Sequence, residues 1–183
     1  YMQTVLYRPG MGYYSTNMAK FGESGDFVTA PEISSLFGQT LGRQAAQILA
    51  EIPHGSVLEL GAGSGRLAVD MLLALEELGR LPLHYDILEV SATLRQRQQT
   101  TIKQSLPHLA QRVRWLDTLP ERFDGIMLAN EVLDATPVHL TVWQNGNIFE
   151  QGVTWHDHTF FWQPRPLSNE VLLSIAQRLP PAQ

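Results

Sequence analysis

The residues best suited to chemistry form one short run, residues 57–66, with the sequence Val-Leu-Glu-Leu-Gly-Ala-Gly-Ser-Gly-Arg. Its apolar start is typical of a buried strand, and its glycines are typical of a turn that leads into a helix. Glycine has no Cβ, so the backbone at Gly61, Gly63 and Gly65 can approach a ligand closely. Glu59 lies two residues before the first glycine. At the carboxyl end of a strand in an open α/β sheet, this arrangement predicts a nucleotide-type cofactor site.

The spacing of the glycines separates two classes of cofactor. Dinucleotide-binding turns follow the pattern G-x-G-x-x-G, in which the third glycine and the free helix N-terminus accommodate a pyrophosphate. Here the pattern is G-x-G-x-G, and Arg66 occupies the position of the third dinucleotide glycine. A ligand with an adenosine and an amino-acid end but no phosphate fits better, so we predict S-adenosyl-L-methionine rather than NAD. Glu59 and the glycine turn would border its amino-acid part. An ordinary tight turn between strand and helix is the alternative interpretation.

Two further carboxylates follow the next predicted strands. Glu89 ends the second strand, where an acidic side chain can accept hydrogen bonds from both hydroxyls of a ribose. Asp117 follows the third strand and could accept a hydrogen bond from an adenine amino group. The simpler interpretations are a surface carboxylate at a strand end for Glu89 and a loop aspartate for Asp117.

The residues after the fourth predicted strand are candidates for chemistry on an acceptor. Asn130, Glu131 and Asp134 should open into the same crevice as the glycine turn. If the chain turns helically after Asn130, the two carboxylates share a face. They could then hold a guanidinium by charge-assisted hydrogen bonds, or accept the proton that a nitrogen nucleophile loses. The alternative is a helix entry, with Asn130 in the turn and first-turn carboxylates favoured by the helix dipole.

Composition argues against several classes of partner. The chain has 183 residues, with 13 Lys and Arg against 18 Asp and Glu and a net charge of −5, so we expect no nucleic-acid partner. It contains no cysteine, which excludes disulfides and cysteine metal sites. His156 and His158 have no nearby third ligand, so we expect no metal site. No apolar stretch reaches the roughly 18 residues of a membrane helix, so we expect no membrane partner.

Alternating elements should position the candidate residues. Hydrophobic periodicity predicts a doubly wound parallel sheet of the α/β class with helices on both faces. Its strands are expected at 56–60, 83–89, 113–116 and 123–129, and its helices at 66–78 and 92–106. An earlier helix should begin at a capping box made of Thr29 and Glu32 and end before Pro53. The first 30 residues, rich in glycine and tyrosine, are expected to form a loop.

The pattern changes after the fourth strand. Three further strands are expected to form an antiparallel meander, at 138–143, 147–155 and 158–162. Asn145-Gly146 predicts a hairpin turn, because both positions tolerate positive φ. A final helix should start near Ser168. We therefore divide the chain into an N-terminal loop region (1–32), a core (33–137), an antiparallel insert (138–166) and a C-terminal helix (167–183).

Three segments in the same order as in a known family make the prediction more specific. Residues 25–34 (Gly-Asp-Phe-Val-Thr-Ala-Pro-Glu-Ile-Ser), the turn at 59–65, and residues 130–138 (Asn-Glu-Val-Leu-Asp-Ala-Thr-Pro-Val) together resemble the MidA family. These are S-adenosylmethionine-dependent methyltransferases of bacteria and mitochondria. The mitochondrial members resemble protein-arginine methyltransferases that modify a subunit of respiratory complex I during its assembly.

The resemblance implies a class I methyltransferase fold, Rossmann-like, with the antiparallel segment as an insert. It implies a protein acceptor arginine, and a location in the bacterial cytoplasm or, as in some members, the mitochondrial matrix. Glu131 is the favoured guanidinium partner or proton acceptor. The cofactor-binding residues that it implies are Asp26, Thr29, Glu59, Gly61, Ala62, Gly63, Gly65, Glu89 and Asp117.

The sequence departs from the family pattern mainly in length. The family's methyltransferase domain continues with further strands past the point where this chain stops, so we expect the chain to correspond to an N-terminal portion. An exposed edge on the fourth strand follows from this, to be covered by a partner chain, such as a second copy in a homodimer, or by the last helix. Three other functions remain open: a methyltransferase acting on a nucleobase or small amine, an NAD-dependent oxidoreductase, and a noncatalytic assembly factor that binds the same cofactor.

Overall fold

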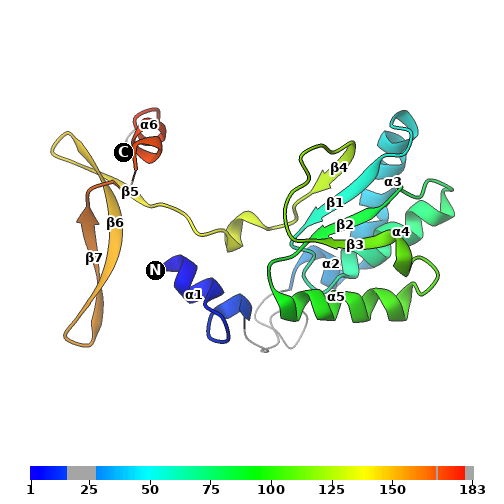
Figure 1. Cartoon of the computed structure of the whole chain (residues 1–183), viewed down its shortest axis with the longest axis horizontal. Helices are drawn as coiled ribbons and strands as arrows, with labels where there is room; N and C mark the ends of the chain where they lie inside the picture. The colour runs from blue at the N-terminus through cyan, green and yellow to red at the C-terminus, as the bar shows by residue number, and fades with distance from the viewer. Residues whose placement is uncertain (16–27, 168, 180–183) are drawn as a thin grey trace.

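A four-stranded parallel sheet forms the core of the larger body of the chain, in a computed structural model that describes residues 1–15, 28–167 and 169–179. Its strand order is β3-β2-β1-β4, and every neighbouring pair is parallel (Figure 1). The strands are β1 (Ser56–Leu60), β2 (Tyr85–Leu88), β3 (Val113–Leu116) and β4 (Gly125–Leu128). The α/β class and the predicted strands are confirmed, because the apolar runs that predicted them are buried on the helix-covered face.

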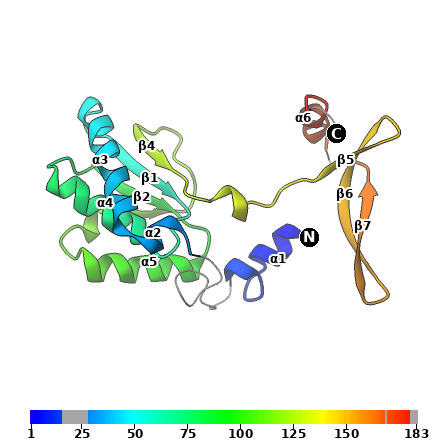
Figure 2. The ribbon, with the colours of Figure 1, turned by 180° about the vertical axis from the view of Figure 1, so that it is seen from behind.

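Three helices cover one face of this sheet. They are α3 (Ser35–Glu51), α4 (Arg66–Glu77) and α5 (Ala92–Ser105), and α3 packs on α4, which packs on α5 (Figure 2). The expected second layer is not found in the described residues, since the segment between β3 and β4 contains no helix. The physical reason is topological. The chain steps in one direction, from β1 to β2 to β3, and right-handed crossovers then place the connecting helices α4 and α5 on the same face. On the other face Met127 is 55% exposed.

Glycines set the distance between α3 and α4. A Cβ built on Gly42 would lie 2.8 Å from the Cβ of Ala74 and 3.2 Å from the carbonyl oxygen of Met71. The absence of a side chain therefore lets the two helices pack closely, and their buried faces complete the core that positions β1.

The variant Gly42→Ala should lower the free energy of unfolding by about 1 to 3 kcal/mol, since the extra methyl forces the helices apart. The loss opposes the gain in helix propensity of about 1 kcal/mol. Urea denaturation measures the change, with the exposed substitution Gln44→Ala on the same helix as the control. A Gly42→Ala protein as stable as the parent would show that the contact relaxes without cost.

The N-terminal region differs from expectation in two places. Residues Met2–Tyr7 form a helix, α1, where a loop was predicted. The predicted capping box is wrong, because the Thr29 side chain makes no capping hydrogen bond and Glu32 instead accepts a hydrogen bond from Ser64 in the glycine turn. A short helix, α2 (Ala30–Ile33), is followed by a break at Ser34. The Ser34 side chain caps α3 by accepting from the amide of Leu36 (3.2 Å).

The antiparallel meander is confirmed as a separate sheet with the order β5-β6-β7. Its strands are β5 (Thr141–Gln144), β6 (Asn147–His156) and β7 (Thr159–Arg165). The predicted hairpin turn is present, with φ of 51° at Asn145 and 77° at Gly146. The last helix, α6 (Glu170–Ala176), is capped by Asn169. It lies beside this sheet and away from β4 in both views, so the expectation that it covers β4 is wrong.

Candidate cofactor and acceptor site

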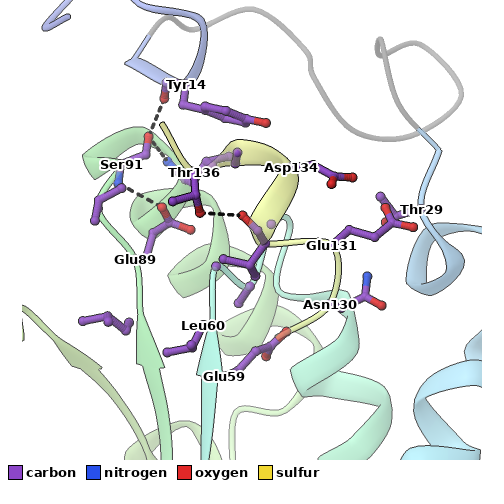
Figure 3. Close-up of a pocket in the computed structure, with 18 of the residues that line it drawn as sticks. Tyr14, Thr29, Glu59, Leu60, Glu89, Ser91, Asn130, Glu131, Asp134 and Thr136 are labelled. Atoms are coloured by element: carbon purple, nitrogen blue, oxygen red, sulfur yellow. Dashed lines mark hydrogen bonds between the residues drawn. The ribbon is translucent and has the colours of Figure 1, made fainter. Parts of the chain in front are cut away.

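A cavity of about 620 Å³ opens at the carboxyl ends of β1, β2 and β4. This is where an open α/β sheet binds its ligands, because the loops that leave neighbouring strands diverge there. Figure 3 shows how the side chains from these strand ends surround it. Among the predicted site residues, those that line the cavity are Thr29, Glu59, Gly61, Ala62, Gly63, Glu89, Asn130, Glu131 and Asp134.

The glycine turn forms the floor beside β1. Gly61, Gly63 and Gly65 all have positive φ, of 61°, 54° and 85°, a conformation that costs a non-glycine residue about 1 to 2 kcal/mol. The turn is closed by a hydrogen bond from the amide of Gly65 to the carbonyl of Ala62 (2.8 Å). Gly65 is the residue before α4 and does not itself line the cavity. The turn therefore leaves bare backbone facing the cavity, as the glycine pattern predicts.

Glu59 lies in the core at the end of β1 and faces the cavity at one edge. The hydroxyl of Tyr85 donates a hydrogen bond to its Oε2 (2.8 Å). Burial raises the pKa of Glu59 to about 7, although the hydrogen bond from Tyr85 favours the charged form. A buried carboxylate with one donor is short of partners, so it is suited to bind a cation that enters the cavity.

Glu89 is held in one orientation at the end of β2. Its Oε1 accepts from the amide of Ser91 (2.9 Å), and its Oε2 accepts from Nε2 of Gln98 (2.9 Å). Burial raises the pKa of Glu89, and these hydrogen bonds oppose that shift. Each carboxylate oxygen has further lone pairs, which can accept hydrogen bonds from a diol such as a ribose.

The segment after β4 places two carboxylates on the other side of the cavity. Glu131 has a φ of 53°, and a 3-10 turn, η3 (Leu133–Ala135), follows. The chain therefore does not turn helically directly after Asn130, which was the condition for the two carboxylates to share a helix face. Even so, Glu131 and Asp134 extend to the same side, away from Glu89. Neither carboxylate forms a hydrogen bond or ion pair with a residue that the structure describes.

Asp117 is a predicted cofactor residue that the structure does not bring to this cavity. Asp117 lies outside the lining, with its side chain 87% exposed and paired with Arg95 (2.9 Å). Leu119, two residues further on, lines the cavity instead. Asp26 lies outside the described residues.

Two tyrosines that no motif in the sequence assigns to the site close the cavity from the N-terminal side. Tyr7 donates a hydrogen bond to the carbonyl of Ala135 (2.6 Å), and its ring stacks on that of Tyr14 with centroids 5.5 Å apart. Ser91 donates to the carbonyl of Tyr14 (2.8 Å). Burial and the nearby charge of Asp134 raise the pKa of Tyr14. The clustering of tyrosines at the start of the chain is the one sequence signal for them, although the glycine- and tyrosine-rich composition there predicts only a loop.

The charge of the cavity decides which ligands suit it. The carboxylates that line it belong to Glu32, Glu59, Glu89, Glu131 and Asp134. None of the described lining residues is Lys, Arg or His. Arg66 pairs with Asp70 through both carboxylate oxygens, at 3.2 and 3.0 Å. A pyrophosphate would find carboxylates and no cation, whereas S-adenosyl-L-methionine carries a sulfonium and an ammonium, so the lining fits this cofactor.

Fold and site together define the chain as a Rossmann-like, S-adenosylmethionine-binding protein of the class I methyltransferase type. A family model described as "Putative S-adenosyl-L-methionine-dependent methyltransferase" matches residues 40–183. Because the match covers most of the chain, the protein belongs to this family. The predicted MidA-type resemblance and the predicted cofactor are confirmed.

Solved and curated relatives agree with this assignment. A crystal structure of a Burkholderia thailandensis protein bound to S-adenosyl-homocysteine has a TM-score of 0.85 and 46% identity, and the match covers 97% of this chain and 47% of that one. The protein arginine methyltransferase NDUFAF7 homolog, mitochondrial, of Caenorhabditis elegans is 31% identical over 162 residues, 76% of this chain and 38% of the relative. The human protein arginine methyltransferase NDUFAF7, mitochondrial, is 31% identical over 165 residues, 76% of this chain and 37% of the relative.

The chain thus spans about two fifths of the length of the curated relatives it matches. In the part of the chain that the structure describes, no helix has both the length and the apolar character needed to cross a bilayer.

Proposed function

We propose that this chain carries the cofactor site and part of the acceptor site of a methyltransferase that modifies arginine side chains of a protein. The observation that carries the proposal is the cavity lining, which has five carboxylates and, among the described residues, no cationic side chain. An acceptor guanidinium is a cation, and carboxylates bind it with short, directional hydrogen bonds. The names of the curated relatives supply the same acceptor class.

Each carboxylate has a separate task in this proposal. Glu59 pairs with the amino-acid end of the cofactor, and Glu89 accepts hydrogen bonds from its ribose. Glu131 and Asp134 hold the acceptor guanidinium in line with the methyl group and take the proton that its nitrogen loses. The bound cofactor would supply the methyl group of its sulfonium, and the S–CH3 bond would break to leave the neutral thioether S-adenosyl-homocysteine, so the work of the protein is positioning and proton removal. Thr29 and Asn130 also line the cavity, on the side of Glu131 and Asp134.

The charge of the site also bears on the competing functions. A nucleic acid would bring phosphates to a wall of carboxylates, which repel them. A noncatalytic assembly factor would still need the cofactor site, but it would not need Glu131 and Asp134 free of protein partners. Both carboxylates lie opposite Glu89 without a hydrogen bond or ion pair to the described residues, which favours an enzyme.

Methyl transfer tests the acceptor assignment. The protein is incubated with methyl-labelled S-adenosyl-L-methionine and synthetic peptides that contain one arginine, with lysine-containing copies for comparison. Glu131→Gln and Asp134→Asn should each lower labelling of the arginine peptides at least 100-fold, because the guanidinium loses a charged partner. Both variants should bind S-adenosyl-homocysteine within threefold of the parent. Glu121→Gln, at an exposed position of the β3–β4 loop, is the control and should label as the parent does.

Two outcomes would redirect the proposal. Cofactor binding with no labelling of any peptide would support the assembly factor. Labelling of the lysine copies alone would place the acceptor in another class of amine.

Location and assembly are also part of the proposal. We place the protein in the bacterial cytoplasm, since the bacterial structure is 46% identical and the mitochondrial relatives are 31–34% identical. The edge strand β4 pairs only with β1 among the described strands. A second copy could cover it in a homodimer. Sedimentation equilibrium measures whether a dimer forms.

A further inference from the structure

One completely buried polar side chain lies between the glycine turn and the end of β2 and has no role in the function proposed above. Gln98, in the middle of α5, has no exposed surface. Its Nε2 donates to Oε2 of Glu89 (2.9 Å) and to the carbonyl of Gly63 (3.1 Å). Its Oε1 accepts from the indole nitrogen of Trp115 on β3 (3.0 Å). One amide thus connects the acidic end of β2, the glycine turn and β3.

Trp115 fixes which way this amide points. An indole N–H can only donate, so the atom of Gln98 that faces it must be the carbonyl oxygen. The NH2 group then faces Glu89 and Gly63, and its two hydrogens match the two acceptors. Both N–H donors of the amide and one of the two lone pairs of its oxygen are used. A buried polar group satisfied in this way is not destabilising.

The same helix also packs against the glycine turn. A Cβ built on Gly65 would lie 3.2 Å from Cα of Gln98. The absence of a side chain at Gly65 therefore lets the turn approach α5 closely. A movement of Gln98 would shift Glu89 and the turn together, because both are bound to one amide group.

We propose that Gln98 is a positioning residue for the cofactor, and that Trp115 sets its amide orientation. Gln98 holds the Glu89 carboxylate and the Gly63 carbonyl at one fixed separation, so that the ribose and the amino-acid end of the cofactor meet their partners at the same time. This inference rests on the assignment of Glu89 to the cofactor. It concerns residues that do not line the cavity themselves, since neither Gln98 nor Trp115 does so.

Calorimetric titration with S-adenosyl-homocysteine tests the inference on the full chain. Gln98→Met keeps the length of the side chain and removes both donors, and should weaken binding at least tenfold. Trp115→Phe leaves the amide free to flip and should weaken binding of S-adenosyl-homocysteine three- to tenfold. The control is Gln96→Met, at an exposed position of the same helix, which should bind as the parent does. Thermal unfolding of each variant establishes that it is folded.

A pH series separates positioning from a general loss of structure. In Gln98→Glu the new carboxylate faces two acceptors and repels Glu89, but when protonated it can donate one hydrogen bond to Glu89. The ratio of the dissociation constant of Gln98→Glu to that of the parent should therefore fall at least threefold from pH 8 to pH 5.5. A merely structural defect would give a ratio that does not change with pH in this direction.

Two results would overturn the inference. Binding by Gln98→Met within twofold of the parent would show that Glu89 needs no help from the amide, and so would a constant ratio for Gln98→Glu. The variant Glu89→Gln distinguishes this failure from a wrong assignment of Glu89. If Glu89→Gln binds S-adenosyl-homocysteine normally, the assignment of Glu89 is itself wrong, and with it the inference.

Discussion

Replacing Gly63 with valine is expected to reduce binding of S-adenosyl-homocysteine more than 100-fold while the protein stays folded. Gly63 lines the cavity and has a φ of 54°. A branched side chain there would occupy the space of the ligand and would also strain the turn, since β-branched residues rarely adopt positive φ. Isothermal calorimetry measures the loss, and urea denaturation measures the accompanying change in stability.

Gly79 supplies a matched control for this variant. It also has positive φ, 63°, but a Cβ built on it would have no neighbour within 4 Å, and it is remote from the cavity. Gly79→Val should therefore lose about 1 to 2 kcal/mol of stability through backbone strain, as Gly63→Val does, and bind the ligand normally. If Gly63→Val kept its affinity, the cofactor could not lie against the glycine turn.

The second large effect is expected at Glu59, where stability and binding should change in opposite directions. Burial raises the pKa of Glu59 to about 7, above its value in the unfolded chain. The folded state therefore holds the proton more tightly than the unfolded state does. The neutral carboxyl is the stable form, and its contribution is complete below pH 4.5 and is lost as the pH rises toward 7. At pH 8 the buried charge costs about 3 kcal/mol.

Glu59→Gln removes that cost. The amide has no proton to lose and can still accept from Tyr85, so the variant should match the parent at pH 5 and exceed its free energy of unfolding by about 2 to 3 kcal/mol at pH 8. Denaturation at both pH values measures this. The control Glu77→Gln, at an exposed position of α4, should not show the same pH-dependent gain.

The affinity for S-adenosyl-homocysteine should change in the opposite direction to the stability. The parent should bind S-adenosyl-homocysteine more tightly as the pH rises from 6 to 8, because the Glu59 carboxylate, which we propose to pair with the ligand's ammonium, forms in that range. Glu59→Gln should bind at least tenfold more weakly at pH 8 and lose this pH dependence. A stabilised variant that binds as tightly as the parent would mean that Glu59 is a buried structural acid and has no part in the site.

The sequence alone was informative wherever a single local rule decides the structure. The strand at 56–60 has the bounds that its apolar run predicts, because a central parallel strand is buried on both sides. The glycines at 61, 63 and 65 form the turn that their lack of a Cβ predicts, and all three have positive φ, which glycine adopts at little cost. The hairpin at Asn145 follows from the same rule.

Other features depended on which residues meet in space, and local patterns could not reveal them. Glu32 has the spacing of a capping residue from Thr29, yet it accepts its hydrogen bond from Ser64, 32 positions away. Asp117 follows a strand as Glu89 does, but Arg95 binds it at the surface. The capping spacing and the strand-end position describe only what a side chain can do with its neighbours in sequence. In the folded protein, distant partners compete for the same carboxylate oxygen atoms.

The type of cofactor site was thus determined by the sequence itself, through glycines whose lack of a side chain acts locally. The state of that site was decided only by the tertiary structure. Packing buries Glu59, and this burial raises its pKa although the hydrogen bond from Tyr85 favours the charged form. Packing also brings Gln98 between Gly63 and Glu89. Burial and orientation arise from contacts between segments far apart in the chain, and no spacing of residues along one segment encodes them.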